Sequence, residues 1–240
     1  MPREISTTQP KTILSHSKTS SENETSNEAK DSKVDRYKFS EVLDYLNKTG
    51  KGFYGNNFKI HSEDEDLINK LAVYFFADKP NADKLNINLD KGILLTGPVG
   101  CGKTCLMSLM KMFLHPKDQH VMKPCRDVSF EFMEEGFQVI HKYGKASFHS
   151  VNGEVSPKIY CFDDLGLENN LKYYGNECNV LGEVLLSRYD LFVSRGMLTH
   201  ITTNLSSSEI EDIYGLRVRS RLREMFNLIA FEKSTLDKRI

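Results

Sequence analysis

The sequence has little of what a secreted or membrane-bound protein needs. It has no tryptophan and only five cysteines in 240 residues, and these cysteines lack the close pairing of a zinc site. An odd number cannot form a complete set of disulfides, so we expect reduced thiols in a cytoplasmic protein. No segment approaches the roughly 20 apolar residues of a membrane span, and the N-terminus has no apolar signal core. We therefore expect no membrane association.

An excess of charge of either sign is also missing. The 32 Lys and Arg residues nearly balance the 33 Asp and Glu residues, which gives a formal net charge of -1 and a pI near 6.7. This balance argues against a protein whose whole surface is built to hold nucleic acid. Any contact with DNA must therefore be local.

The composition divides the chain into three parts. Residues 1–35 are polar, with too few apolar side chains to offset the entropy of ordering, and predict a disordered tail. This tail is either a solvated leader, which we favour, or a segment that folds on a partner. Residues 36–90 predict an N-terminal helical segment and connector, and residues 91–240 predict the globular core.

Two helices are predicted in the N-terminal segment. Apolar residues recur at helical spacing over residues 39–46, with Ser40 as N-cap and Gly50 as stop. The apolar face of this helix either packs on the core, which we favour, or meets another protein. A second apolar stripe over residues 63–77 predicts a core helix, and residues 80–90 predict a polar connector.

From residue 92 onward, strand-like apolar runs alternate with helical patterns. This alternation is typical of crossover units and predicts an α/β fold with a parallel sheet. The expected strands are residues 92–96, 127–130, 158–162, 197–202 and 227–231. The expected helices are residues 103–113, 133–143, 180–193 and 208–224.

A complete phosphate-loop pattern (P-loop) lies between the first of these strands and the helix after it. It reads Gly97-Pro98-Val99-Gly100-Cys101-Gly102-Lys103-Thr104 and is followed by Cys105. Glycines let such a loop turn its backbone N–H groups toward a phosphate, and the helix N-terminus adds a positive dipole end. Lys103 would supply charge to the β and γ oxygens, and the Thr104 hydroxyl would bind Mg²⁺. Residues 97–105 thus predict a site for ATP and Mg²⁺.

A second acidic element follows at a suitable distance. The apolar run that ends at Phe162 delivers two carboxylates, Asp163 and Asp164, at the end of a predicted strand. Asp163 is the expected metal partner, and Asp164 is placed where a base could orient the attacking water. Acidic strand ends are common turns, but after a P-loop this pair favours a catalytic role.

With these motifs in view, residues 92–231 resemble the AAA+ ATPases of the DnaC/IstB type, which load replicative helicases or assist transposases. The most specific stretches are Asp163-Asp164-Leu165-Gly166-Leu167-Glu168 and, at the end of the next helix, Leu186-Ser187-Arg188-Tyr189. The resemblance implies a P-loop NTPase fold of the AAA+ type, with three layers around a parallel sheet. It also implies that the helical lid of many AAA+ proteins is missing, because nine residues follow Phe231.

The resemblance also implies functional roles for residues that would otherwise be given an ordinary structural role. Asn204 is similar to the sensor 1 residue that helps to orient the attacking water, although Asn also suits a strand exit. Arg221 is similar to the arginine finger that enters a neighbouring subunit's site, with Arg217 as second candidate. Arg219 and Arg223 fit a solvated basic helix face.

These roles imply an ATP-hydrolysing accessory factor in DNA replication or transposition. Its implied partners are a replicative helicase or transposase and single-stranded DNA, and it would assemble as an ATP-dependent homo-oligomer. A nucleotide kinase or GTPase is the less favoured alternative, because no Asn-Lys-x-Asp motif is present. A nucleotide-dependent switch with little turnover stays open, since Asp164 stands where glutamate is more usual. The cysteine cluster with which some relatives bind zinc is missing.

Overall fold

The computed structural model describes residues 37–151, 153–168, 171–173 and 176–239, so the predicted tail lies outside the described residues. Its centre is a five-stranded sheet in the order β2-β5-β8-β1-β9, and every neighbouring pair is parallel. These strands are β1 (Gly92–Thr96), β2 (Val121–Pro124), β5 (Tyr160–Leu165), β8 (Thr199–Thr203) and β9 (Phe226–Ala230). The α/β fold with a central parallel sheet is therefore confirmed.

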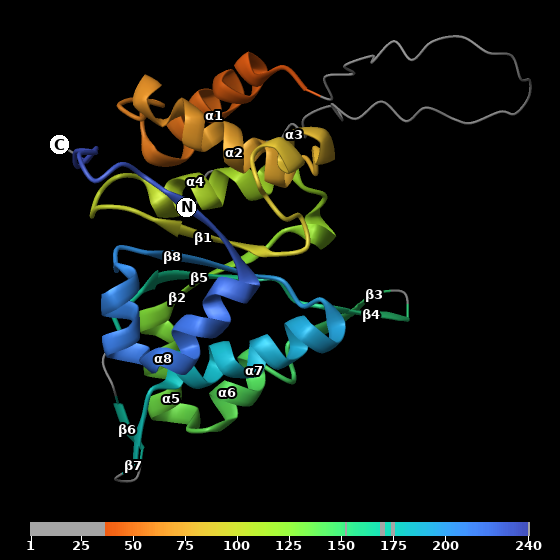
Figure 1. Ribbon diagram of the computed structural model, residues 1–240, viewed down its shortest axis with the longest axis vertical. Coiled ribbons are helices and arrows are strands. Elements are labelled where there is room, and N and C mark those ends of the chain that lie inside the picture. The colour runs from red at the N-terminus through yellow and green to blue at the C-terminus, as the bar shows by residue number, and fades with distance from the viewer. Residues whose placement is uncertain (1–36, 152, 169–170, 174–175, 240) are drawn as a thin grey trace, which may run out of the picture.

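Helices cover both faces of the sheet (Figure 1). One layer holds α1 (Phe39–Tyr54), α2 (Glu65–Phe75), α3 (Lys79–Lys84) and α4 (Lys103–Met110). The other layer holds α5 (Cys125–Glu135), α6 (Gln138–Tyr143), α7 (Val180–Arg195) and α8 (Ser207–Met225). Two antiparallel hairpins extend from the second layer, β3 (Phe148–Val151) with β4 (Glu154–Pro157) and β6 (Leu171–Tyr173) with β7 (Asn176–Cys178). Within the described residues, no helix is long and apolar enough to cross a membrane.

Alternate side chains of β1 enter different hydrophobic clusters. Ile93 and Leu95 of β1 join the cluster beneath α1, α2 and α4, whereas Leu94 between them joins the cluster beneath α5, α7 and α8. Both clusters are buried, so β1 is apolar along its whole length and does not alternate with polar residues. Gly92 lets β1 approach its neighbour, because a Cβ there would lie 1.6 Å from the carbonyl oxygen of Thr199.

The strand order determines where a ligand can bind. The chain passes from β1 to one side for β2, β5 and β8, and then returns to the other side of β1 for β9. In open parallel sheets, ligands bind at the carboxyl ends of the strands where this order reverses. The P-loop begins directly after β1, at that point of reversal. The described residues that follow β9, 231–239, contain no helix.

One predicted strand is wrong. Residues 127–130 lie within α5, whose buried residues Cys125, Val128 and Phe132 recur at helical spacing. Phe130, an apolar residue of the predicted strand, is 54% exposed. The central-sheet strand that precedes β5 is instead β2, which the sequence pattern did not reveal because its edge position leaves its four residues exposed or half-buried.

Several predicted boundaries also change. The first helix continues through Gly50 to Tyr54, and Lys38 stands at the N-cap position assigned to Ser40. The predicted connector over residues 80–90 contains most of α3, which Asp78 caps with its carboxylate. Tertiary packing outweighs the helix-breaking tendency of Gly50 here, because Gly50 is buried against the ring of Phe58.

Two predicted helices are interrupted by glycine. Gly136, with φ of 63°, separates α5 from α6 where one helix over residues 133–143 was expected. Gly215, with φ of 85° and ψ of 160°, kinks α8 within the expected helix of residues 208–224. Only glycine adopts such angles readily, so a single glycine in the sequence marks each break.

Arg188 of α7 is fully buried beneath the sheet. Its N–H groups donate, over 2.7 to 3.2 Å, to Thr199 Oγ1, Tyr143 O, Ser147 Oγ, Lys158 O and Leu198 O. Burial lowers the pKa of Arg188 to about 10. Because neutral oxygens satisfy this guanidinium, it joins α7 to the starts of β5 and β8 and fixes their register.

Two buried histidines make the fold sensitive to acid. The rings of His120 and His200 lie 4.9 Å apart, and Nδ1 of His200 accepts the Ile93 N–H at 3.0 Å. Burial and nearby Lys111 lower the pKa of His120 to about 3, and burial followed by the charge of His120 holds the pKa of His200 well below its usual value. Both rings must therefore be neutral in the folded protein.

The free energy of unfolding should fall as the pH drops below about 6.5, where the unfolded chain binds protons that the folded chain excludes. The loss should reach ~2 kcal/mol per histidine at pH 5. Urea denaturation at pH 7.5 and pH 5 measures it. His120→Leu should reduce the difference between the two pH values, whereas the exposed control His141→Gln should keep it. An equal pH difference in wild type and His120→Leu would contradict this assignment.

Candidate nucleotide site

The P-loop joins β1 to α4 and has the backbone that anion binding requires. Gly100 and Gly102 have φ of 79° and 100°, and Gly102 stands at the N-cap of α4. Lys103, 6% exposed, turns its ammonium back onto the loop and donates to the carbonyls of Gly97 at 2.9 Å and Pro98 at 2.8 Å. A phosphate in the loop would meet this buried charge together with the N-terminus of α4.

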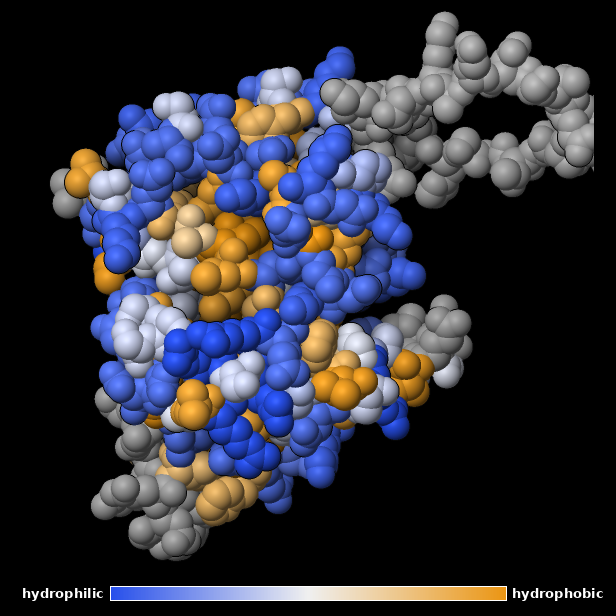
Figure 2. Space-filling model, viewed as in Figure 1, coloured by the Kyte–Doolittle hydropathy of each residue, from blue (hydrophilic) through white to orange (hydrophobic). Residues whose placement is uncertain are grey.

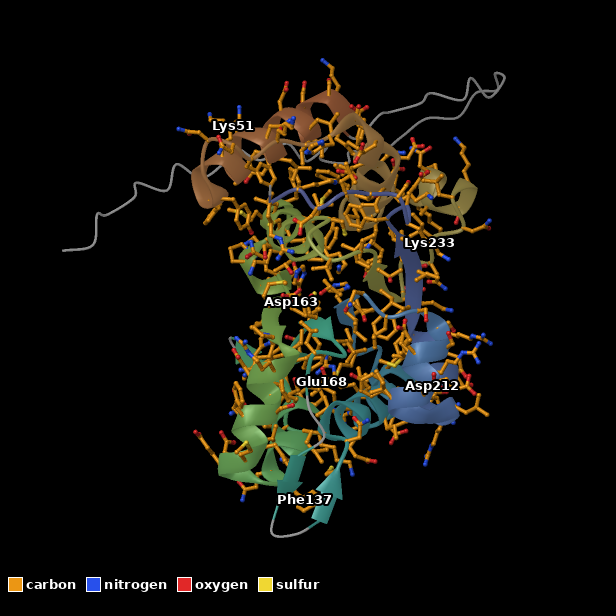
Figure 3. The ribbon with its side chains drawn as sticks, turned by 90° about the vertical axis from the view of Figure 1, so that its left-hand side faces the viewer. Lys51, Phe137, Asp163, Glu168, Asp212 and Lys233 are labelled. Carbon is orange, nitrogen blue, oxygen red and sulfur yellow. The ribbon has the colours of Figure 1, made fainter. Side chains whose placement is uncertain are left out.

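A carboxylate from β5 meets the hydroxyl that follows the lysine. The Thr104 hydroxyl lies 3.0 and 3.1 Å from the two carboxylate oxygens of Asp163. Asp163 is 7% exposed and lies near the middle of the molecule, between the two helical layers (Figure 3). Burial and the neighbouring Asp164 raise its pKa, while hydrogen bonds from Thr202 and Thr104 and the charge of Lys103 oppose that rise.

These oxygen donors suit a hard divalent cation that also binds phosphate. Mg²⁺ is usually held by one or two carboxylates together with phosphate oxygens and water, and a hydroxyl beside a carboxylate fits that pattern. In the described part of the chain, no group of three His, Cys, Asp or Glu side chains could hold a metal ion alone. The residues present therefore fit Mg²⁺ carried by a nucleotide, with Thr104 and Asp163 as its protein ligands.

Asp164 adopts an unusual backbone conformation. Its φ is 57°, in the left-handed region, and the pairing of β5 with β8 shifts register between Phe162 and Leu165. Such a bulge changes the direction of a side chain at a strand end, and Asp tolerates the left-handed region better than most residues. The N–H of Asp164 donates to Thr202 Oγ1 at 2.9 Å, so β8 holds the bulge in place. The Asp164 side chain remains half-exposed.

The sequence did not single out Thr202, yet this residue bonds the carboxylate of Asp163 and the backbone of Asp164. Its hydroxyl donates to Asp163 Oδ1 at 2.6 Å and accepts the Asp164 N–H. The next residue, Thr203, donates to the Leu165 carbonyl at 2.7 Å. The sequence feature that could have pointed to Thr202 is the pair of threonines at the end of a buried strand. Only the pairing of β5 with β8 shows which groups these threonines bind.

Asn204 follows β8 and is exposed. With Gly97 and Pro98 it lines one end of a groove of about 550 Å³ that continues along α8 and β9. The apolar wall of this groove includes Leu228, which is 67% exposed, and Figure 2 shows apolar side chains gathered between the two helical layers. Asn204 thus lies beside the start of the P-loop.

Glu168 connects the carboxylate loop to α8. Its carboxylate accepts the Gly166 N–H at 2.9 Å through one oxygen and the Tyr214 hydroxyl through the other. In Figure 3 Glu168 lies below Asp163, toward the second helical layer. Tyr214 is buried and directly precedes the kink at Gly215. The segment after β5 is therefore bonded to the helix that carries the arginines.

The predicted arginine fingers lie after that kink. The Arg221 guanidinium stacks 4.3 Å over the Tyr189 ring and lies 3.4 Å from the Glu224 carboxylate. Arg217 is exposed. Arg219, expected to be solvated, instead pairs with Glu211 and is half-buried. The structure therefore places Arg217 and Arg221 on α8, apart from the cluster formed by Lys103, Thr104 and Asp163.

Two cysteines lie in or next to the P-loop and differ in burial. Cys101 is buried, with its sulfur 3.9 Å from the Lys103 ammonium, while Cys105 is half-buried in α4. Burial raises the pKa of both thiols. Both are free thiols, as are the other three cysteines.

Comparison with known proteins gives similarity only among solved structures. No protein-family model matches the chain, and no curated protein matches it. The DnaC helicase loader is 18% identical over 72% of this chain and 92% of its own, with a TM-score of 0.49. DnaI is 19% identical over 73% of this chain and 89% of its own, with a TM-score of 0.47. Domain III of the replication initiation protein DnaA of Thermotoga maritima is 18% identical over 73% and 65%, with a TM-score of 0.47.

Thr202→Val should weaken Mg²⁺-dependent ATP binding about tenfold, because Asp163 loses a charge-assisted hydrogen bond and the Asp164 bulge loses its acceptor. The Mg²⁺ concentration that gives half-maximal binding of an ATP analogue measures the effect. Thr203→Val is the matched control, since its hydroxyl bonds a carbonyl and not a carboxylate. Equal Mg²⁺ requirements for the two variants would show that Thr202 does not position the metal site.

Proposed function

We propose that this chain is an ATP-binding and ATP-hydrolysing AAA+ accessory factor in DNA replication or transposition, of the kind that loads a helicase. The observation that carries the proposal is the contact of Thr104 with Asp163, at 3.0 and 3.1 Å. It joins the end of the P-loop to the end of β5, which are 59 positions apart in the chain. Such a hydroxyl and carboxylate can share one Mg²⁺ on a triphosphate.

The chain's own residues supply the remaining steps. Lys103 and the N–H groups of the loop would bind the β and γ phosphates, with residues 97–105 around them. Bound Mg²⁺ would supply charge neutralisation at the phosphate oxygens. Asp164 and Asn204, one on the bulge of β5 and one after β8, would orient water for attack on the γ phosphorus.

Assembly would complete the site. Arg221, or Arg217 as second candidate, would reach the nucleotide of a neighbouring copy and stabilise charge in the transition state. ATP would then hold subunits together on single-stranded DNA, and hydrolysis would release them. The partner delivered would be a replicative helicase or a transposase, and the work would take place in the cytoplasm.

The ATPase rate per subunit should rise with protein concentration and with single-stranded DNA, because the proposed finger acts between copies. Arg221→Ala should lower this rate about 100-fold or more while ATP binding persists. Arg223→Ala, an exposed arginine of the same helix, is the matched control. A rate that depends on neither protein nor DNA concentration, and that Arg221→Ala leaves unchanged, would contradict the proposal.

Asp164→Asn separates the enzyme from the alternative, a nucleotide-dependent switch with little turnover. In an enzyme it should lower hydrolysis about 100-fold or more and trap bound ATP, because the group that orients water is lost. In a switch it should change little. The ratio of ATP to ADP that stays with the purified protein after incubation measures the difference, and Lys103→Ala should abolish binding in both cases.

A further inference from the structure

The chain returns to the P-loop after its last strand. The Phe231 N–H donates to the Thr96 carbonyl at 2.8 Å, which carries the pairing of β9 with β1 one residue further. A turn follows, in which the Thr235 N–H donates to Glu232 O at 3.0 Å, and then the Lys238 N–H donates to Gly100 O at 3.1 Å. In Figure 1 this segment runs from β9 past α4 to the C-terminal end of the chain. We call residues 232–239 the C-terminal strap.

Lys238 anchors the strap at two places. Its backbone bonds the middle of the P-loop, and its ammonium forms an ion pair with Asp64, directly before α2. These side chains are 15% and 7% exposed, and the ammonium lies 5.1 Å from the centre of the Phe231 ring. A paired charge with so little solvent around it fixes the strap, since separating the pair would leave a buried carboxylate without its partner.

The two residues beside Lys238, Asp237 and Arg239, lie at the P-loop as an ion pair. A Cβ on Gly100 would lie 2.1 Å from the carboxyl carbon of Asp237, so this carboxylate packs directly on the glycine. Arg239 holds the same carboxylate through a two-point contact, Nε to Oδ1 at 2.9 Å and Nη2 to Oδ2 at 2.6 Å. This contact lowers the pKa of Asp237 to about 2.

The charge of Asp164 acts on Arg239 as well. Hydrogen bonding and charge attraction to Asp237 raise its pKa, and the charge of Asp164 adds to that rise. The side chain of Arg239 is 66% exposed, and that of Asp237 is 31% exposed, so the pair can separate without opening the core. An exposed ion pair of this kind contributes little stability, about 1 kcal/mol or less, and exchanges partners easily.

We propose that Arg239 is a phosphate-binding residue of the nucleotide site, and that a triphosphate takes the place of Asp237 as its partner. This inference rests on the proposed function of the site. A guanidinium binds phosphate through the same two-point geometry that it uses with a carboxylate, and a triphosphate carries more charge. Without nucleotide, Asp237 would hold Arg239 at the P-loop. When ATP binds, its phosphates would repel the Asp237 carboxylate and bind the Arg239 guanidinium in its place.

Binding of a fluorescent, non-hydrolysable ATP analogue with Mg²⁺ to the full chain tests this exchange. Arg239→Ala should weaken binding about tenfold, and Arg239→Lys should recover part of the loss. Asp237→Asn should tighten binding several-fold, because it removes a negative charge beside the phosphates and frees Arg239. Arg126→Ala, which removes an exposed arginine from α5, is the charge-matched control and should bind as wild type does.

The outcomes separate this inference from the function on which it rests. If the wild-type chain binds the analogue, Lys103→Ala does not, and Arg239→Ala binds like Arg126→Ala, the assignment of Arg239 is wrong while the nucleotide site stands. Weaker binding by Asp237→Asn would also overturn it. If wild type binds no analogue, both proposals fail. Amide exchange at Lys238 gives a second readout, since ATP should change its protection in wild type more than in Arg239→Ala.

Discussion

One buried carboxylate holds the candidate site together. Asp163 receives the Thr104 hydroxyl from the P-loop helix and the Thr202 hydroxyl from β8, so three segments meet on a single side chain. A buried charge requires such partners, because an unpaired carboxylate at this depth would cost several kcal/mol. The same need orders the surroundings, since the hydroxyl that satisfies Asp163 also holds the bulge that aims Asp164. The hydrogen bond that satisfies the buried Asp163 carboxylate therefore also sets the position of Asp164.

From this centre, contacts extend to α8 on one side and to the C-terminal strap on the other. Glu168 bonds Tyr214, and one residue later the glycine kink redirects α8 toward the segment that carries Arg217 and Arg221. On the other side, Lys238 bonds the P-loop and Asp64 and sets Arg239 over the loop. Glu168 thus bonds the segment after β5 to the helix that carries these arginines, and Gly100 bonds the P-loop to the strap. Both connections consist of a few polar bonds beside the apolar sheet.

Sequence signals are strong where a single residue type determines the local structure. Glycines mark the P-loop and the breaks at Gly136 and Gly215, and short apolar runs mark Ile93 to Leu95 of β1 and Tyr160 to Phe162 of β5. The sequence misled where burial decides, because residues 127–130 were predicted to be an apolar strand but form part of a helix that exposes Phe130. The edge strand β2 had no pattern to find, since an edge with half-buried residues needs neither alternation nor an apolar run.

The sequence by itself determined the phosphate loop, the paired carboxylates and the α/β class, because local spacing and backbone freedom suffice for these features. Only the tertiary structure decided that Thr202 bonds both the Asp163 carboxylate and the Asp164 backbone, that Arg188 is satisfied by neutral oxygens, and that the pair of Asp237 and Arg239 lies at the P-loop. The physical reason is distance along the chain. Each of these contacts joins segments that the sheet order brings together, and no local pattern records which hydroxyl, carbonyl or carboxylate will stand opposite a given side chain.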